Sequence, residues 1–134
     1  MQGRRIAFDF GLARIGVAIC DPDGILATPL EAVPTKGYRG AIKKLIEEYQ
    51  PVALYVGKPL HLSGGTSTSL ESAREFAQEL ERFGIPIHLI DERFSTKSAA
   101  RSLSESGYTA KESKSKIDSA AAVAILESAL AMEK

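Results

Sequence analysis

Acidic residues stand at three places where predicted elements of secondary structure begin or end. Asp9 lies near the end of an apolar stretch, and Asp91 and Glu92 directly follow another. Asp118 falls in the first turn of the last predicted helix, just before the alanines at 120–122. Carboxylates that gather at one point repel one another unless a cation lies among them, and they suit Mg²⁺ or Mn²⁺. Such ions promote attack of water on phosphorus, so the chemistry indicated is phosphodiester hydrolysis, provided that the fold brings the acids together.

The first part of the chain has the pattern of an antiparallel three-stranded meander. Residues 5–10 and 14–20 are predicted strands joined by a short link, which favours a hairpin. The segment 21–24 (Asp-Pro-Asp-Gly) is a typical turn. A third strand is predicted over 25–33, and Pro29 within it suits the edge of a sheet.

The rest of the chain alternates between helical and strand patterns. Apolar residues at helical spacing predict helices, and short continuous apolar runs predict buried strands. The predicted elements are a helix over 41–49, a strand over 52–56, a loop over 57–69, a helix over 70–83 ended by Gly84, a strand over 85–90, a helix over 95–103, a polar segment over 104–115 and a helix over 117–132.

This order predicts an α/β fold with a mixed five-stranded sheet and helices on both faces. We expect the strands over 52–56 and 85–90 to be central and parallel to the first strand. Ligands of such sheets bind beyond the carboxyl ends of parallel strands, where Asp9 would meet Asp91 or Glu92. The last helix, packed across the sheet, would bring Asp118 alongside.

Each acid also has a structural explanation when it is taken alone. A lone Asp at the end of a strand, such as Asp9, is more often a turn or capping residue, and a group such as 91–93 (Asp-Glu-Arg) more often forms surface ion pairs. Asp118 would interact favourably with the dipole of its helix. Only the joint placement of these acids favours a metal site.

Four motifs, in order along the chain, resemble those of the YqgF/RuvX family. This family comprises pre-16S rRNA nucleases that are also described as Holliday junction resolvases. The motifs are 9–18 (Asp-Phe-Gly-x-x-Arg-Ile-Gly-Val-Ala), 57–60 (Gly-Lys-Pro-Leu) with 63–65 (Ser-Gly-Gly), 91–96 (Asp-Glu-Arg-Phe-Ser-Thr) with Ala99, and 116–122 (Lys-Ile-Asp-Ser-Ala-Ala-Ala) with Ile125 and Leu126.

The resemblance implies a single RNase H-like nuclease domain over residues 1–134 that depends on Mg²⁺ or Mn²⁺. It implies catalytic, metal-binding acids at Asp9, Glu92 and Asp118, with Asp91 as a neighbouring candidate. Strand alternation sends residues 91 and 92 to opposite sides, so only one is expected to reach the metals, and we rank Glu92 first.

The family also implies cytoplasmic maturation of the 5′ end of 16S rRNA in ribosome biogenesis. The alternatives are a Holliday junction resolvase acting in DNA recombination and repair, and a non-catalytic rRNA-binding assembly factor. A single cut at a precursor end needs only a monomer, whereas a symmetric junction suits a homodimer.

The sequence departs from the family pattern at two points. Leu12 and Ala13 stand where a hydroxyl and a variable residue are common, and Ala121 stands where RuvC-type resolvases carry a further acid. The second departure leaves open whether two metal ions bind without substrate.

Composition narrows the class of protein further. The 134 residues are 44% hydrophobic and 25% charged, as in ordinary globular domains. No run of about 18 apolar residues predicts a membrane span, and no signal peptide is expected. The single cysteine, Cys20, excludes a disulfide framework and fits a buried strand position in a reducing cytosol. Pairing of Cys20 with a second chain is the minority alternative.

The formal net charge of zero hides a local pattern. Seventeen basic and seventeen acidic residues exclude a generally basic polyanion binder. Residues 93–116, however, hold six basic residues against two acidic ones. A nucleic acid, either pre-rRNA or branched DNA, is the expected partner, and its binding should be modest and sensitive to salt. The candidate phosphate contacts are Arg14, Lys58, Arg93, Lys114 and Lys116.

Overall fold

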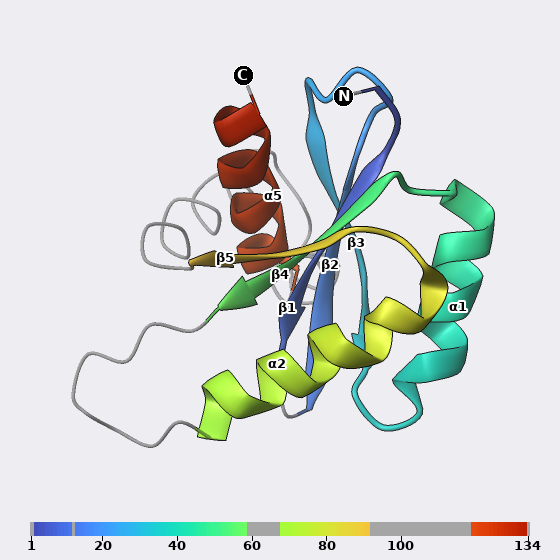
Figure 1. The fold of residues 1–134 in the computed structure, drawn as a ribbon, viewed down its shortest axis with the longest axis vertical. Helices are drawn as coiled ribbons and strands as arrows, with labels where there is room; N and C mark the ends of the chain where they lie inside the picture. Colours follow the sequence, from blue (N-terminus) through green and yellow to red (C-terminus); the bar gives the residue numbers. More distant parts are fainter. Residues whose placement is uncertain (1, 12, 59–67, 92–118, 134) are drawn as a thin grey trace, which may run out of the picture.

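The computed structural model describes residues 2–11, 13–58, 68–91 and 119–133. The described elements, labelled in Figure 1, follow one another in the order β1 (Arg5–Phe10), β2 (Arg14–Cys20), β3 (Ala27–Pro34), α1 (Tyr38–Tyr49), β4 (Ala53–Lys58), α2 (Thr68–Leu80), a 3₁₀ turn η1 (Glu81–Phe83), β5 (Ile87–Asp91) and α5 (Ala120–Glu133).

The five strands form one mixed sheet in the order β3-β2-β1-β4-β5. β1 pairs antiparallel with β2, and β2 pairs antiparallel with β3, which is the predicted meander. β4 pairs parallel with β1, and β5 pairs parallel with β4. The predicted mixed sheet is therefore confirmed, as are the edge position of the third strand and the direction of the two later strands.

The prediction that both later strands are central is wrong for the second of them. β4 lies between β1 and β5, but β5 is the outer strand of the sheet. Because β2 and β3 occupy one side of β1, β4 takes the other side, and the next crossover leads beyond it. The exposure of β5 fits a position at the edge of the sheet, since Leu89 is 42% exposed.

Several predicted boundaries shift for local reasons. β3 begins at Ala27 instead of residue 25, because the carboxylate of Asp21 accepts hydrogen bonds from the backbone N–H groups of Ile25 and Leu26, each at 2.8 Å. These bonds extend the turn by two residues. The helix predicted over 70–83 begins at residue 68 and tightens into η1 after Leu80. It ends at Gly84, whose φ of +71° gives the predicted stop.

Helix α1 begins three residues earlier than the apolar spacing predicts. Gly37, with a φ of +74°, precedes its first residue, Tyr38. The Tyr38 ring lies 5.2 Å from the ring of Phe76 on α2, so this extra turn is held by packing.

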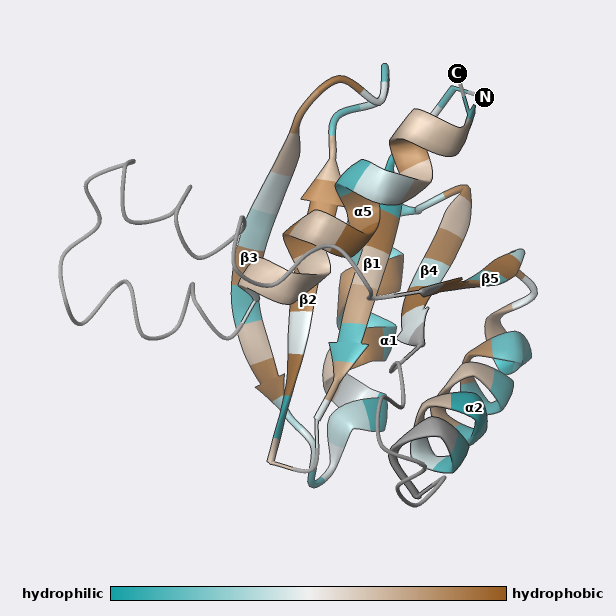
Figure 2. Ribbon diagram, turned by 90° about the vertical axis from the view of Figure 1, so that its left-hand side faces the viewer, coloured by the Kyte–Doolittle hydropathy of each residue, from teal (hydrophilic) through white to brown (hydrophobic). Residues whose placement is uncertain are grey.

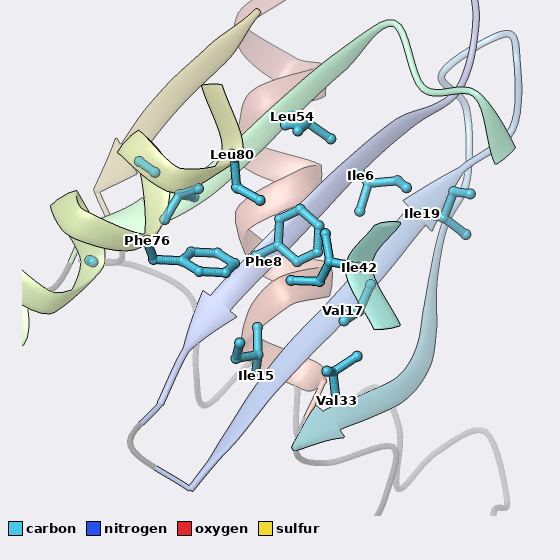
Figure 3. Packing of buried hydrophobic residues seen from close by; sticks show 13 residues of the cluster. Ile6, Phe8, Ile15, Val17, Ile19, Val33, Ile42, Leu54, Phe76 and Leu80 are labelled. Atoms are coloured by element: carbon cyan, nitrogen blue, oxygen red, sulfur yellow. The ribbon is translucent and has the colours of Figure 1, made fainter. Parts of the chain in front are cut away.

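Helices cover both faces of the sheet, as predicted. α1 and α2 pack on one face, where Phe8 and Phe76 meet edge to face at 5.5 Å (Figure 3). α5 crosses the other face (Figure 2). There it meets small side chains of the sheet, Ala7, Ala18 and Ala53, which allow close approach.

Other predicted segments fall outside the described residues. They are most of the loop over 57–69, the helix over 95–103, the polar segment over 104–115 and the first two residues of the last predicted helix. Among the helices that the structure describes, none is long and apolar enough to cross a membrane.

Candidate functional site

Asp9 is half-buried near the carboxyl end of β1, on the face that α5 covers. Ala7, two residues earlier, belongs to the cluster of side chains beneath α5, and alternate residues of a strand share a face. Across the antiparallel ladder, Asp9 lies opposite Gly16 of β2. On the other side, Phe8 pairs with Val56, so the next residue of β4, Gly57, lies beside Asp9.

Two buried glycines therefore flank the carboxylate of Asp9. Gly16 and Gly57 lie inside strands, where the extended backbone accepts any residue. Neither glycine places a side chain beside Asp9, and glycines inside strands often mark a point where another group approaches closely. Both glycines belong to the sequence motifs, but the motifs do not indicate that the two lie on either side of Asp9. The register of the sheet is what reveals their common position.

The three parallel strands end at the same edge of the sheet. β1 ends at Phe10, β4 at Lys58 and β5 at Asp91. Lys58 and Asp91 are partners in the β4–β5 register. The fold thus brings Asp9 and the backbone of Asp91 to one edge, as predicted, with β4 between them. Glu92, the next residue in the sequence, lies outside the described residues.

The turn that follows Asp9 is held from β3. Thr35 donates a hydrogen bond from its hydroxyl to the backbone C=O of Gly11 at 2.7 Å, and one from its N–H to that of Ala13 at 3.1 Å. A Cβ at Gly11 would lie 2.5 Å from the backbone oxygen of Arg14, so this turn admits only glycine without a shift. Thr35 carried no signal in the sequence, since its role depends on β3 reaching the first turn.

The start of α5 is fixed to the sheet by Ser119. Its hydroxyl accepts a hydrogen bond from the N–H of Val17 at 3.0 Å and donates one to the C=O of Leu30 at 2.6 Å. Val17 follows Gly16, the residue opposite Asp9. Asp118 directly precedes Ser119 in the sequence and lies outside the described residues. Sequence reasoning missed Ser119, although a serine beside a run of alanines is a weak signal of a special position.

The far end of α5 carries a second anchor. Glu133 forms an ion pair with the buried Arg5 of β1, with Oε1 and Nη2 3.0 Å apart. Burial, together with the nearby Glu133 carboxylate, raises the pKa of Tyr55 above its ordinary value. Cys20 is free and buried, as predicted, and its sulfur accepts a hydrogen bond from the N–H of Arg5 at 3.3 Å. Arg5 begins β1, whereas Asp9 lies near the other end of the same strand.

Of the four predicted acids, Asp9 is the one whose side chain is among the described residues. Within these ranges, no three His, Cys, Asp or Glu side chains stand close enough together to hold a metal ion. Of the other predicted acids, Asp91 is described in its backbone alone, and Glu92 and Asp118 are outside. The donor chemistry of Asp9 nevertheless fits a hard cation, because a carboxylate is a ligand that Mg²⁺ and Mn²⁺ take.

All of the predicted phosphate contacts remain predictions. Arg14 is exposed and begins β2, at the end of the sheet where Asp9 lies. Lys58 is the last residue of β4, but its side chain is not described. Three further basic candidates lie outside the described residues: Arg93, Lys114 and Lys116.

Comparison with known proteins gives matches over nearly the whole chain. A family model described as RuvX, Holliday junction resolvase, matches residues 3–132. A protein of Streptomyces avermitilis is 49% identical, covering 99% of this chain and 88% of its own length. One of Streptomyces coelicolor is 46% identical (99% and 83%), and one of Rhodococcus jostii is 47% identical (94% and 76%). All three carry the name pre-16S rRNA nuclease.

Solved structures confirm the predicted RNase H-like fold. RuvC of Thermus thermophilus, in complex with a Holliday junction substrate, matches with a TM-score of 0.61 and 15% identity. The match covers 97% of this chain and 95% of RuvC. The yeast mitochondrial Holliday junction resolvase matches with a TM-score of 0.50 and 12% identity, covering 98% and 81%. At sequence identities this low, the matches show similarity of the fold alone.

Proposed function

Because the chain belongs to the RuvX family, we propose that it is a Mg²⁺- or Mn²⁺-dependent endonuclease that hydrolyses phosphodiester bonds in nucleic acid. The observation that carries this proposal is the position of Asp9. It is a half-buried acid at the edge where three parallel strands end, with glycines on both sides. Sites for ligands of open α/β sheets lie at such edges.

We propose Asp9, Glu92 and Asp118 as the acids that hold the metal. β1 and β5 are two strands apart, a distance of about 10 Å, which carboxylates reaching toward a shared ion can span. Ile90 belongs to the cluster beneath α5, on the same face as Asp9. Glu92 has the parity of Ile90, which favours Glu92 over Asp91 as the acid on that face.

The chain's own residues would position the phosphate and the metal. Bound ions would supply activation of water and stabilisation of the leaving oxygen. Asp9 provides a carboxylate whose backbone is fixed in the interior of the sheet. Gly16 and Gly57 place no side chain beside it, which would favour the approach of a phosphate group, and Thr35 fixes the turn that follows it.

The phosphate backbone would be held by basic residues around this edge. Arg14 is exposed and stands at the Asp9 end of β2, where a guanidinium can bind phosphate through two hydrogen bonds. We propose Lys58, Arg93, Lys114 and Lys116 as further contacts. Binding should weaken as salt rises, by a little under one power of the salt concentration for each phosphate contact, and the small number of contacts should keep the affinity modest.

The preferred substrate is the 5′ extension of pre-16S rRNA, and this choice rests on the names of the relatives. With this substrate, we propose that the protein acts in the cytoplasm. The description of the family favours a second candidate, a four-way DNA junction. The first substrate needs a monomer, and the second suits a homodimer. A non-catalytic rRNA-binding role is the remaining alternative.

Cleavage of the two substrates side by side tests this proposal. A pre-16S rRNA fragment with its 5′ extension and a four-way DNA junction are incubated with the protein and Mn²⁺. Asp9→Asn serves as the inactive variant, and Asp23→Asn, on an exposed turn, is the matched control. We expect the wild type and Asp23→Asn to cut the RNA, and Asp9→Asn to leave it intact. Cutting of the junction alone would favour the DNA function. Folded wild-type protein that binds RNA but cuts neither substrate would support the assembly-factor alternative.

A further inference from the structure

The hydroxyl of Ser119 occupies an unusual place, between two strands of the sheet. Val17 and Leu30 are partners in the β2–β3 register, immediately beside the point where this register shifts. The Ser119 hydroxyl accepts from the N–H of Val17 at 3.0 Å and donates to the C=O of Leu30 at 2.6 Å. The residue is fully buried. The hydroxyl thus bridges the two strands, and its single proton is committed to Leu30.

This use differs from the ordinary role of serine before a helix. A serine at that position commonly accepts a hydrogen bond from an N–H of the first helical turn. Here the backbone C=O of Ser119 accepts from the N–H of Val123, which begins the helical pattern. Both hydrogen bonds of the hydroxyl go to the sheet instead. The first turn of α5 is therefore fixed relative to β2 by specific bonds in addition to packing.

We infer that Ser119 is a positioning residue for the proposed metal site, because it fixes the start of α5, which Asp118 directly precedes in the sequence, to the strand that faces Asp9. Val17 follows Gly16, which lies opposite Asp9, and Asp118 directly precedes Ser119 in the sequence. The two bonds of one hydroxyl therefore join the backbone next to Asp118 to the strand that faces Asp9. This inference rests on the proposed function, because it takes Asp118 as an acid that holds the metal.

Removing the hydroxyl should leave the rest of α5 in place. The helix is also held by the buried Ile125 and Leu126 and, at its far end, by the pair between Glu133 and Arg5. Ser119→Ala should therefore loosen the first turn without releasing the helix. Partners that orient metal ligands typically change metal affinity by about 10- to 100-fold when they are removed.

The test is Mn²⁺ binding without substrate, measured by calorimetry and by electron paramagnetic resonance of Mn²⁺. We expect Ser119→Ala to weaken Mn²⁺ binding roughly 10-fold. Ser119→Thr, which keeps the hydroxyl, should restore part of the affinity. Ile125→Val removes one buried methylene from the same helix and is the matched control, expected to bind as the wild type does. Faster hydrogen exchange at the Val17 amide in Ser119→Ala would report loss of the bond independently.

A second comparison asks whether the effect passes through Asp118. On the background of Asp118→Asn, Ser119→Ala should cause little further loss of Mn²⁺ affinity, because the acid that it positions is gone. An undiminished further loss would overturn the inference, as would equal affinity of Ser119→Ala and wild type. If Asp118→Asn binds Mn²⁺ as tightly as the wild type, the proposed metal site itself is wrong. The two failures are thereby distinguished.

Discussion

Asp9 and Gly16 lie directly opposite each other in the β1–β2 ladder, so no side chain stands beside the carboxylate on that strand. Gly57 of β4, beside Asp9 on the other side, likewise carries no side chain. An acid at the end of a strand is common, and an acid between two buried glycines of adjoining strands is not explained by a turn or a cap. This relationship is the structural reason for treating Asp9 as the centre of the site.

A methyl group opposite Asp9 should impair the reaction before it impairs the fold. Gly16→Ala adds one methyl group in a strand conformation that alanine tolerates. Because small displacements at a reacting centre are costly, we expect cleavage to fall roughly 10- to 100-fold. Single-turnover cleavage and thermal unfolding, measured on the same preparations, check this. A variant as active as the wild type would show that the space beside Asp9 is not used.

The first turn should be intolerant of any side chain at residue 11. In Gly11→Ala the new Cβ would meet the backbone oxygen of Arg14 at 2.5 Å, and a backbone atom cannot move aside cheaply. We expect a loss of about 1–3 kcal/mol in the free energy of unfolding, the usual cost of overpacking. Urea denaturation measures it, with Gly40→Ala on α1, where a Cβ meets nothing within 4 Å, as the matched control. Equal stability of Gly11→Ala and wild type would contradict the described turn.

The ion pair at the far end of α5 should matter for stability and not for cleavage. Arg5 is 4% exposed and Glu133 is 19% exposed in their side chains. Glu133→Gln removes the carboxylate charge that pairs with the buried guanidinium, which should lower the free energy of unfolding by about 2–3 kcal/mol. Cleavage per folded molecule should stay unchanged, because Asp9 is at the other end of β1. A parallel loss of cleavage at a temperature where the variant is folded would argue against this separation.

Stability should fall at alkaline pH partly through Tyr55. Burial, and then the Glu133 carboxylate, raise its pKa in the folded protein above the ordinary value of 10.0. The stabilisation that depends on the neutral phenol is therefore complete below pH 10 and is lost as pH rises through the folded-state pKa. Urea denaturation as a function of pH measures the loss, which should be smaller in Tyr55→Phe. The same alkaline decline in both proteins would assign it to other groups.

The sequence predicts those parts of the fold that depend on local patterns of residues. Alternation and turn residues predicted the meander, and apolar spacing predicted α1 and α2. The position of β5 at the edge was mispredicted because a short apolar run looks the same in a central strand and in an outer one. The start of β3 was placed two residues early, because the bonds from Asp21 to Ile25 and Leu26 depend on the folded turn.

The sequence predicts the candidate acids of the site, which stay predictions, but it does not predict their surroundings. Asp9 was identified from its place at the end of a strand. The contributions of Gly57, Thr35 and Ser119 depend on register and on contacts between distant segments, which no window of sequence contains. Ser119 shows this most clearly, because its partners are 102 and 89 residues away along the chain.

The most direct test of the account is single-turnover cleavage of the pre-16S rRNA fragment by wild type and Asp9→Asn over a range of Mn²⁺ concentrations. The account predicts that wild-type cleavage requires Mn²⁺ and stops when the metal is chelated. It predicts that Asp9→Asn, with an unchanged thermal unfolding midpoint, gives no product at any Mn²⁺ concentration. Cleavage by Asp9→Asn at the wild-type rate, or wild-type cleavage that persists without divalent metal, would contradict it.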